Sequence, residues 1–92
     1  MKFIYPAVFS KTEDSRYTGY FPDLEGILVT GDSLEEAVDE ANQAALDWIT
    51  AELMEDDAYL PPVSEPEDLA LSPGDVLRNI CVTVRFYEGL DE

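Results

Sequence analysis

The chain has 92 residues, 46% of them hydrophobic, which is enough for one compact domain and too few for two. Five Lys and Arg against 21 Asp and Glu give a formal net charge of −16. This charge would repel a phosphate backbone, so direct nucleic-acid binding by the chain is not expected. No stretch approaches the ~20 apolar residues that span a bilayer, and no long apolar segment opens the chain, so we expect a cytoplasmic protein.

Residues 2–9 alternate with the period of a β-strand. One face would carry Phe3, Tyr5, Ala7 and Phe9, and the other Ile4 and Val8. Because both faces are apolar, one is expected to pack against a helix and the other against a different cover, such as a second copy of the chain. Pro6 cannot donate a ladder hydrogen bond, so the strand is either unpaired on one side there or bulged.

A polar turn at residues 11–15 precedes an aromatic segment, residues 16–21, which is typical of the second strand of a hairpin. Residues 22–26 combine Pro, Asp and Gly and predict a turn. Residues 27–30 follow as a short, apolar third strand. The first part of the chain therefore predicts three antiparallel strands.

Ser33 and Glu36 have the spacing of a capping box, so a helix should begin at Leu34. Apolar residues then recur at steps of three and four, which predicts a stripe that faces the core. The stripe consists of Leu34, Ala37, Val38, Ala41, Ala45, Trp48, Ile49 and Leu53. We interpret Trp48 as core filling whose indole N–H needs an acceptor.

Residues 58–74 are rich in proline and acids and predict a loop, with a short helical turn near residues 66–71. Residues 76–87 are β-branched and form the expected fourth strand. The prediction is an α+β fold in the order β-β-β-α-β, as a single domain over residues 1–92. A right-handed crossover would return the fourth strand parallel to the first.

The chain lacks the residues of several common enzyme classes. It has no histidine and one cysteine, Cys81, which we interpret as a small buried hydrophobe, so nucleophilic catalysis and zinc binding of the usual kinds are not expected. A Mg²⁺ nuclease would need acids that converge from several elements. Asp23, Asp32 and Asp75 stand at turns, where acids usually have structural roles, so we assign no metal, cofactor or catalytic residue.

The acids of the predicted helix are arranged against its own stability. Like-charged pairs at i,i+4 spacing, each of which costs a few tenths of a kcal/mol in an isolated helix, are Glu35 with Asp39, Glu36 with Glu40, and Glu52 with Asp56. Glu55, Asp56 and Asp57 follow at the helix C-terminus, where the macrodipole favours cations. Two interpretations remain: a solvated face with a frayed end, or a surface for a cationic partner.

Three segments together resemble the HicB antitoxin family. They are YPAVF at residues 5–9, FPDLEG at residues 21–26 and GDSLEEA at residues 31–37, in matching order and spacing. The resemblance covers about residues 1–60 well and the last strand loosely. It differs at Glu25, where the family commonly has proline, and the chain ends at Glu92 without the DNA-binding segment of many HicB proteins, so autorepression is not expected.

The resemblance implies a degraded ribonuclease-H-like fold without catalytic acids. It also implies a partner of the HicA type, a small basic toxin that cleaves mRNA and would be neutralised by occlusion of its RNA-binding surface. The residues expected to contact this partner are Tyr20, Phe21, Asp23, Glu36, Asp39 and Glu40. The alternatives are an orphan scaffold or regulatory domain that forms homodimers or larger homo-oligomers, and a metal-dependent nuclease.

Overall fold

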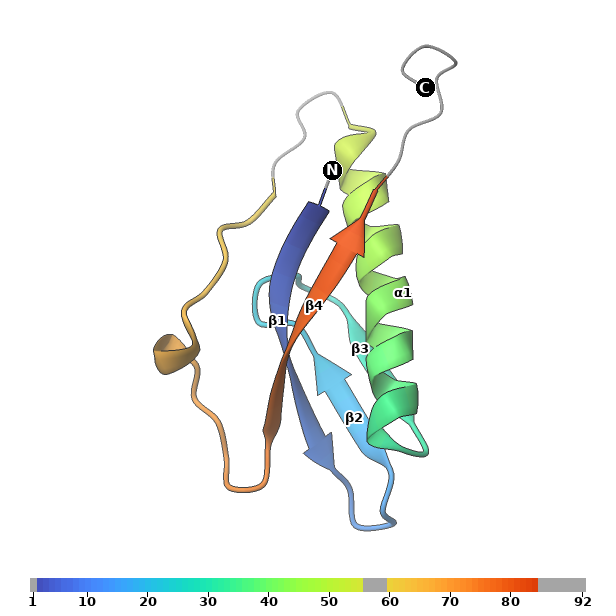
Figure 1. Cartoon of the computed structure of the whole chain (residues 1–92), viewed down its shortest axis with the longest axis vertical. Helices are drawn as coiled ribbons and strands as arrows, with labels where there is room; N and C mark the ends of the chain where they lie inside the picture. The colour runs from blue at the N-terminus through green and yellow to red at the C-terminus, as the bar shows by residue number, and fades with distance from the viewer. Residues whose placement is uncertain (1, 56–59, 85–92) are drawn as a thin grey trace.

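The computed structural model describes residues 2–55 and 60–84 and contains one long helix packed against a four-stranded sheet (Figure 1). The strands are β1 (Lys2–Lys11), β2 (Tyr17–Tyr20), β3 (Leu28–Gly31) and β4 (Val76–Thr83). The helix, α1, spans Leu34–Leu53, and a short 3₁₀ helix, η1, spans Pro66–Asp68. This confirms the α+β class and the expected element order.

The sheet is antiparallel throughout, in the order β3-β2-β1-β4. The expectation that β4 runs parallel to β1 was wrong, because Phe9 near the end of β1 pairs with Val76 at the start of β4. The reason lies in the connection. After the helix, residues 60–75 run back along the length of the sheet, so that β4 starts at the end where β1 finishes (Figure 1).

The proline in β1 is accommodated without a bulge. Pro6 stands opposite Asn79 in an unbroken register with β4, whereas pairing with β2 begins only at Val8. The strand is therefore unpaired on one side at Pro6, as one of the two alternatives predicted.

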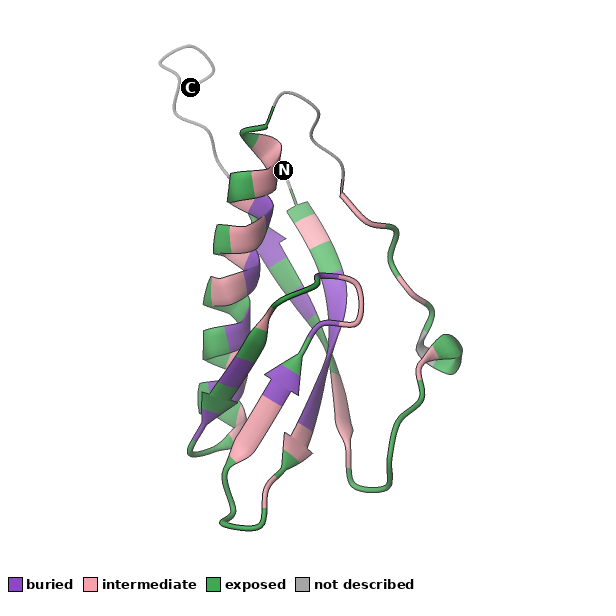
Figure 2. Cartoon of the chain, turned by 180° about the vertical axis from the view of Figure 1, so that it is seen from behind, coloured by how far each residue is buried: buried purple, intermediate pink, exposed green. Residues whose placement is uncertain are grey.

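The core lies between α1 and the inner face of the sheet (Figure 2). From the helix, Ala37, Ala41, Ala45 and Ile49 are buried, at the spacing that places them on one stripe. The sheet contributes Tyr5, Ala7, Phe9, Val29, Ile80 and Val82. The alanines let the helix approach closely, and a Cβ at Gly19 would lie 2.5 Å from the ring of Phe9, so the glycine in β2 makes room for this side chain.

Two expectations concerned single side chains: that Trp48 fills the core and that Cys81 is buried. Trp48 packs against the core, and its Nε1–H donates to Glu25 O at 3.1 Å, which confirms the interpretation as core filling. Cys81 is exposed, so the expectation of a buried thiol was wrong. Alternation explains the difference, because Ile80 and Val82 on either side of Cys81 are buried and β4 turns the thiol outward.

Candidate partner-binding surface

The capping box fixes the position at which the acidic helix begins. Ser33 Oγ accepts a hydrogen bond from Glu36 N–H at 3.1 Å, and Glu36 Oε1 accepts one from Asp32 N–H at 2.6 Å. The first bond satisfies a donor that the helix start leaves without a partner, and the second ties Glu36 back to the residue before the N-cap. Glu36 therefore has a structural role in addition to the partner contact expected for it.

The side of α1 that faces away from the sheet is acidic. Eight helix residues are exposed and five of them are carboxylates. The eight are Glu35, Glu36, Asp39, Glu40, Asn42, Gln43, Asp47 and Ala51. The last turn of α1 contains no basic residue to offset this charge. The exposed side of α1 is consequently a continuous source of negative potential.

The acids form two rows along the helix. Glu36 and Glu40 are one turn apart, and Asp47 lies two turns beyond Glu40, with Gln43 Nε2 donating to Asp47 Oδ1 at 3.1 Å. Glu35 and Asp39 form the second row. Glu35 and Asp47 were not among the expected contacts; the i,i+4 and i,i+7 spacing to Asp39 and Glu40 was the signal that could have identified them.

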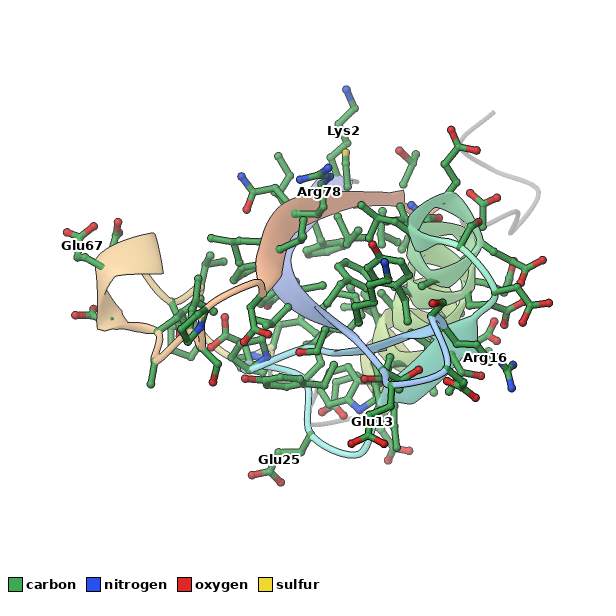
Figure 3. The ribbon with its side chains drawn as sticks, turned by 90° about the horizontal axis from the view of Figure 1, so that it is seen from below. Lys2, Glu13, Arg16, Glu25, Glu67 and Arg78 are labelled. Carbon is green, nitrogen blue, oxygen red and sulfur yellow. The ribbon has the colours of Figure 1, made fainter. Side chains whose placement is uncertain are left out.

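The row of Glu35 and Asp39 borders β4. Together with Leu34, Val38 and Arg78 these residues line a shallow groove. Figure 3 places Arg78 and Lys2 on the same side of the molecule, opposite Glu13 and Glu25. Arg78 on β4 thus marks one margin of the acidic surface.

The structure separates the expected contacts at residues 20–23 from those on the helix. Tyr20 is 42% exposed on the outer face of β2, on the opposite side of the sheet from α1. Phe21 is only 3% exposed and packs in the core, so its side chain is not presented to a partner in the isolated chain. Asp23 accepts hydrogen bonds from Ser64 N–H at 2.8 Å and from Ser64 Oγ at 2.5 Å, which tie residues 60–64 to the turn before β3.

The other turn acids also have local structural partners. Asp32 Oδ1 lies 2.9 Å from Arg16 Nε. Asp75 accepts hydrogen bonds from Ser10 Oγ at 2.7 Å and from Ser72 N–H at 2.9 Å, and these bonds hold the pKa of its carboxyl below the ordinary value of 3.8.

Within residues 2–55 and 60–84, no three His, Cys, Asp or Glu residues come together as a metal site. Of the helices described, none is long and apolar enough to cross a membrane.

Comparison with solved structures finds the same fold in antitoxins. The N-terminal domain of the Burkholderia pseudomallei antitoxin HicB has a TM-score of 0.69 and 25% identity, over 91% of this chain and all of that one. A structure described as the HicA3 and HicB3 toxin-antitoxin complex has a TM-score of 0.61 and 30% identity, over 85% and 95%. A toxin-antitoxin complex from Streptococcus pneumoniae has a TM-score of 0.67 and 23% identity, over 90% and 70%.

Sequence comparison leads to the same group of proteins. No curated protein sequence matches the chain. The sequence model described as the HicB-like antitoxin of bacterial toxin-antitoxin systems matches residues 5–84, which include all of α1 and β4 and most of β1. The chain belongs to the HicB-like antitoxin family.

Proposed function

We propose that this chain is a non-enzymatic antitoxin, acting as a single domain, that binds a small basic HicA-type ribonuclease and covers its RNA-binding surface. The observation that carries the proposal is the exposed side of α1, where five of eight exposed residues are acidic. Family membership and the complex of HicA3 and HicB3 to which the chain is similar support it. The cytoplasm, where mRNA is found, is the proposed site of action.

The physical basis is complementary charge. A toxin that binds RNA needs a basic surface, because phosphate contacts supply much of the affinity for nucleic acid. Glu35, Asp39 and Glu40 would meet the same lysines and arginines that contact RNA, which would speed encounter and fix the orientation of the complex. Inhibition by coverage requires no catalytic group on the antitoxin, and the helix provides a rigid support for the carboxylates.

The unfavourable placement of the acids also supports a role in binding. Glu35 with Asp39 and Glu36 with Glu40 are like charges one helical turn apart, and each pair destabilises a helix by roughly 0.2–0.5 kcal/mol. A helix selected for stability alone would place cations at some of these positions. A cationic partner that covers the pairs would turn this repulsion into attraction.

The decisive experiment compares two triple variants with the same change in net charge. The first neutralises the helix (Glu35→Gln, Asp39→Asn, Glu40→Gln), and the control neutralises exposed acids of loops and η1 (Glu13→Gln, Glu25→Gln, Glu67→Gln). Affinity for a purified HicA-type protein encoded beside this chain is measured by calorimetry at low and high salt. We expect the helix variant to lose on the order of tenfold or more in affinity, and wild-type binding to weaken with salt.

Three outcomes would contradict the proposal. Absence of a complex at low ionic strength, together with failure to rescue growth on co-expression, would exclude the antitoxin role. Equal losses in the two triple variants would show that total charge matters and not the helix surface. Cleavage of RNA by the purified chain alone, in the presence of Mg²⁺, would show that it is an enzyme.

A further inference from the structure

Two shallow grooves flank the second half of α1, one toward each edge of the sheet. The strand order places β3 and β4 at the two edges, and α1 packs against both strands. The uncharged residues that line the groove on the β3 side are Gly26, Ile27, Leu28, Ala44 and Trp48. Those that line the groove on the β4 side are Leu46, Thr50, Ala51, Met54, Thr83 and Val84. Both grooves are therefore mainly apolar.

Asp47 stands on the ridge between these grooves. It lines both of them, and it is the one charged residue among the described residues that do so. Gln43 Nε2 donates to Asp47 Oδ1 at 3.1 Å, which orients the carboxylate along the exposed side of the helix. The bond from Trp48 Nε1–H to Glu25 O sets the orientation of the ring in the β3-side groove. The second half of α1 thus presents one oriented negative charge with apolar surface on either side.

The first half of α1 has a different composition. Its exposed residues are Glu35, Glu36, Asp39, Glu40, Asn42 and Gln43. In the second half, the exposed residues are Asp47 and Ala51. Charges act over roughly 10 Å at about 0.1 M salt, whereas apolar side chains stabilise a complex only when they are in contact. The first half is therefore suited to the approach of a charged partner, and the second half to its retention.

We propose that the second half of α1 binds an element of the basic partner that places a lysine or arginine on Asp47 and apolar side chains in the two grooves. This inference rests on the proposed function and gives the two halves of the helix different roles. The acids of the first half would speed association, and Asp47 with its grooves would slow dissociation.

The chemistry of the site favours a cation with an apolar stem. The aliphatic part of a lysine or arginine covers apolar surface while its charged end reaches a carboxylate. Apolar contacts around such a pair exclude water, which strengthens the attraction between the two charges. An anionic element would be repelled by Asp47 and by the acids of the first half of α1.

The first test separates the rate of dissociation from the rate of association. Ala51→Gln places a polar side chain in the β4-side groove without a change in charge, and Ala70→Gln makes the same change at an exposed position before β4. Binding of each variant to the purified HicA-type protein encoded beside this chain is followed on a biosensor. We expect Ala51→Gln to raise the dissociation rate about fivefold or more with the association rate unchanged, and Ala70→Gln to match wild type.

The second test removes the charge between the grooves. Asp47→Asn keeps the oxygen that accepts from Gln43, and Asp68→Asn makes the same change at an exposed position in η1. We expect Asp47→Asn to raise the dissociation rate on the order of tenfold, and Asp68→Asn to change it by less than about twofold. The triple variant of the first half should instead mainly lower the association rate and its dependence on salt.

A third readout depends on no substitution. Trp48 is the one tryptophan of the chain, so labelling with fluorotryptophan gives a single fluorine signal from the β3-side groove. Addition of the unlabelled HicA-type protein should shift this signal. Circular dichroism checks that each variant is folded, and if Ala51→Gln does not fold, Asp47→Asn and the fluorine signal decide the question.

Distinct results would overturn this inference and the proposed function. If a complex forms but Ala51→Gln and Asp47→Asn dissociate at the rates of their controls, or the fluorine signal does not move, the grooves are not occupied and the antitoxin role stands. If wild type forms no complex with the HicA-type protein, the grooves lose their occupant and both proposals fail.

Discussion

The exposed side of α1 and the outer face of β2 and β3 both contact solvent in the single chain, but their chemistry differs completely. On the helix, Glu35, Glu36, Asp39, Glu40 and Asp47 make up most of the exposed residues. On the outer face of β2 and β3, the exposed residues are Tyr20, Leu28 and Thr30. In a chain with 21 acids, exposure alone does not decide where the charge is placed.

The two surfaces also differ in what they cost the fold. The carboxylates of α1 repel one another, and no basic residue in the last turn complements the helix dipole, so the helix depends on its buried alanine stripe and on Ile49 for stability. The side chains on the outer face of β2 and β3 oppose nothing in the single chain, but they leave apolar surface in water. In the isolated chain, the helix surface therefore carries unneutralised negative charge, and the sheet surface exposes apolar side chains to water.

The largest expected effect comes from contrasting the two faces of the sheet. Phe9 is fully buried beneath the helix, whereas Leu28 points outward and is 73% exposed. We expect Phe9→Ala to lower the free energy of unfolding by about 3–5 kcal/mol, and Leu28→Ala to change it by less than about 1 kcal/mol. Urea denaturation of both variants measures the contrast. Similar losses would mean that Leu28 contributes to the core and is not a free surface residue.

The fold was largely predictable because the strong local signals agree with one another. Ser33 and Glu36 identified the helix start, and the apolar steps from Ala37 to Ile49 identified its buried side. The direction of β4 was not predictable from these signals. It depends on the path of the connection after α1, and proline and acidic residues define a loop without defining where the loop leads.

The acidic composition of the candidate surface was predictable, and the arrangement of its expected contact residues was less so. Glu36, Asp39 and Glu40 lie on the exposed side of the helix, where the 3.6-residue period places them. Phe21 and Tyr20 are neighbours in sequence, but Phe21 is buried while Tyr20 faces solvent on the far side of the sheet. A sequence motif does not show which of its aromatic residues serves the core. The exposure of Cys81 was equally hard to predict, because its neighbours on both sides in the sequence are buried.

A second prediction concerns the bond that anchors the acidic helix. Ser33→Ala removes the acceptor for Glu36 N–H, and we expect a loss of about 1 kcal/mol in the free energy of unfolding. Glu36→Gln keeps an oxygen that can accept from Asp32 N–H, so its loss should be smaller. Thermal denaturation followed by circular dichroism compares the two variants. A larger loss for Glu36→Gln would show that its charge, and not its hydrogen bond, stabilises the helix start.

A third prediction concerns the pH dependence of stability that comes from Asp75, a carboxylate at the sheet margin that accepts hydrogen bonds. Hydrogen bonds from Ser10 Oγ and Ser72 N–H lower the pKa of Asp75 below 3.8 in the folded chain. Its ionised form therefore stabilises the fold above pH 3.8, and this contribution is lost as the pH falls through the lower folded pKa. Asp75→Asn should be less stable than wild type at neutral pH, and the difference should shrink below pH 3.8. A difference that is constant down to the most acidic pH tested would contradict this assignment.

The smallest expected effect comes from a substitution that tests directly how much the acids of α1 lower the stability of the fold. Glu40→Gln removes one member of the Glu36–Glu40 pair, and relief of this repulsion should raise the free energy of unfolding by roughly 0.2–0.5 kcal/mol. The gain should fade at high salt, because screening already weakens the repulsion in wild type. Glu67→Gln in η1 is the matched control, since it removes the same charge from an exposed position outside α1. If Glu40→Gln is more stable but binds a basic toxin more weakly, the carboxylate of Glu40 serves binding at the expense of the fold. If Glu40→Gln is less stable than wild type, repulsion between the helix acids does not lower stability as their spacing suggests.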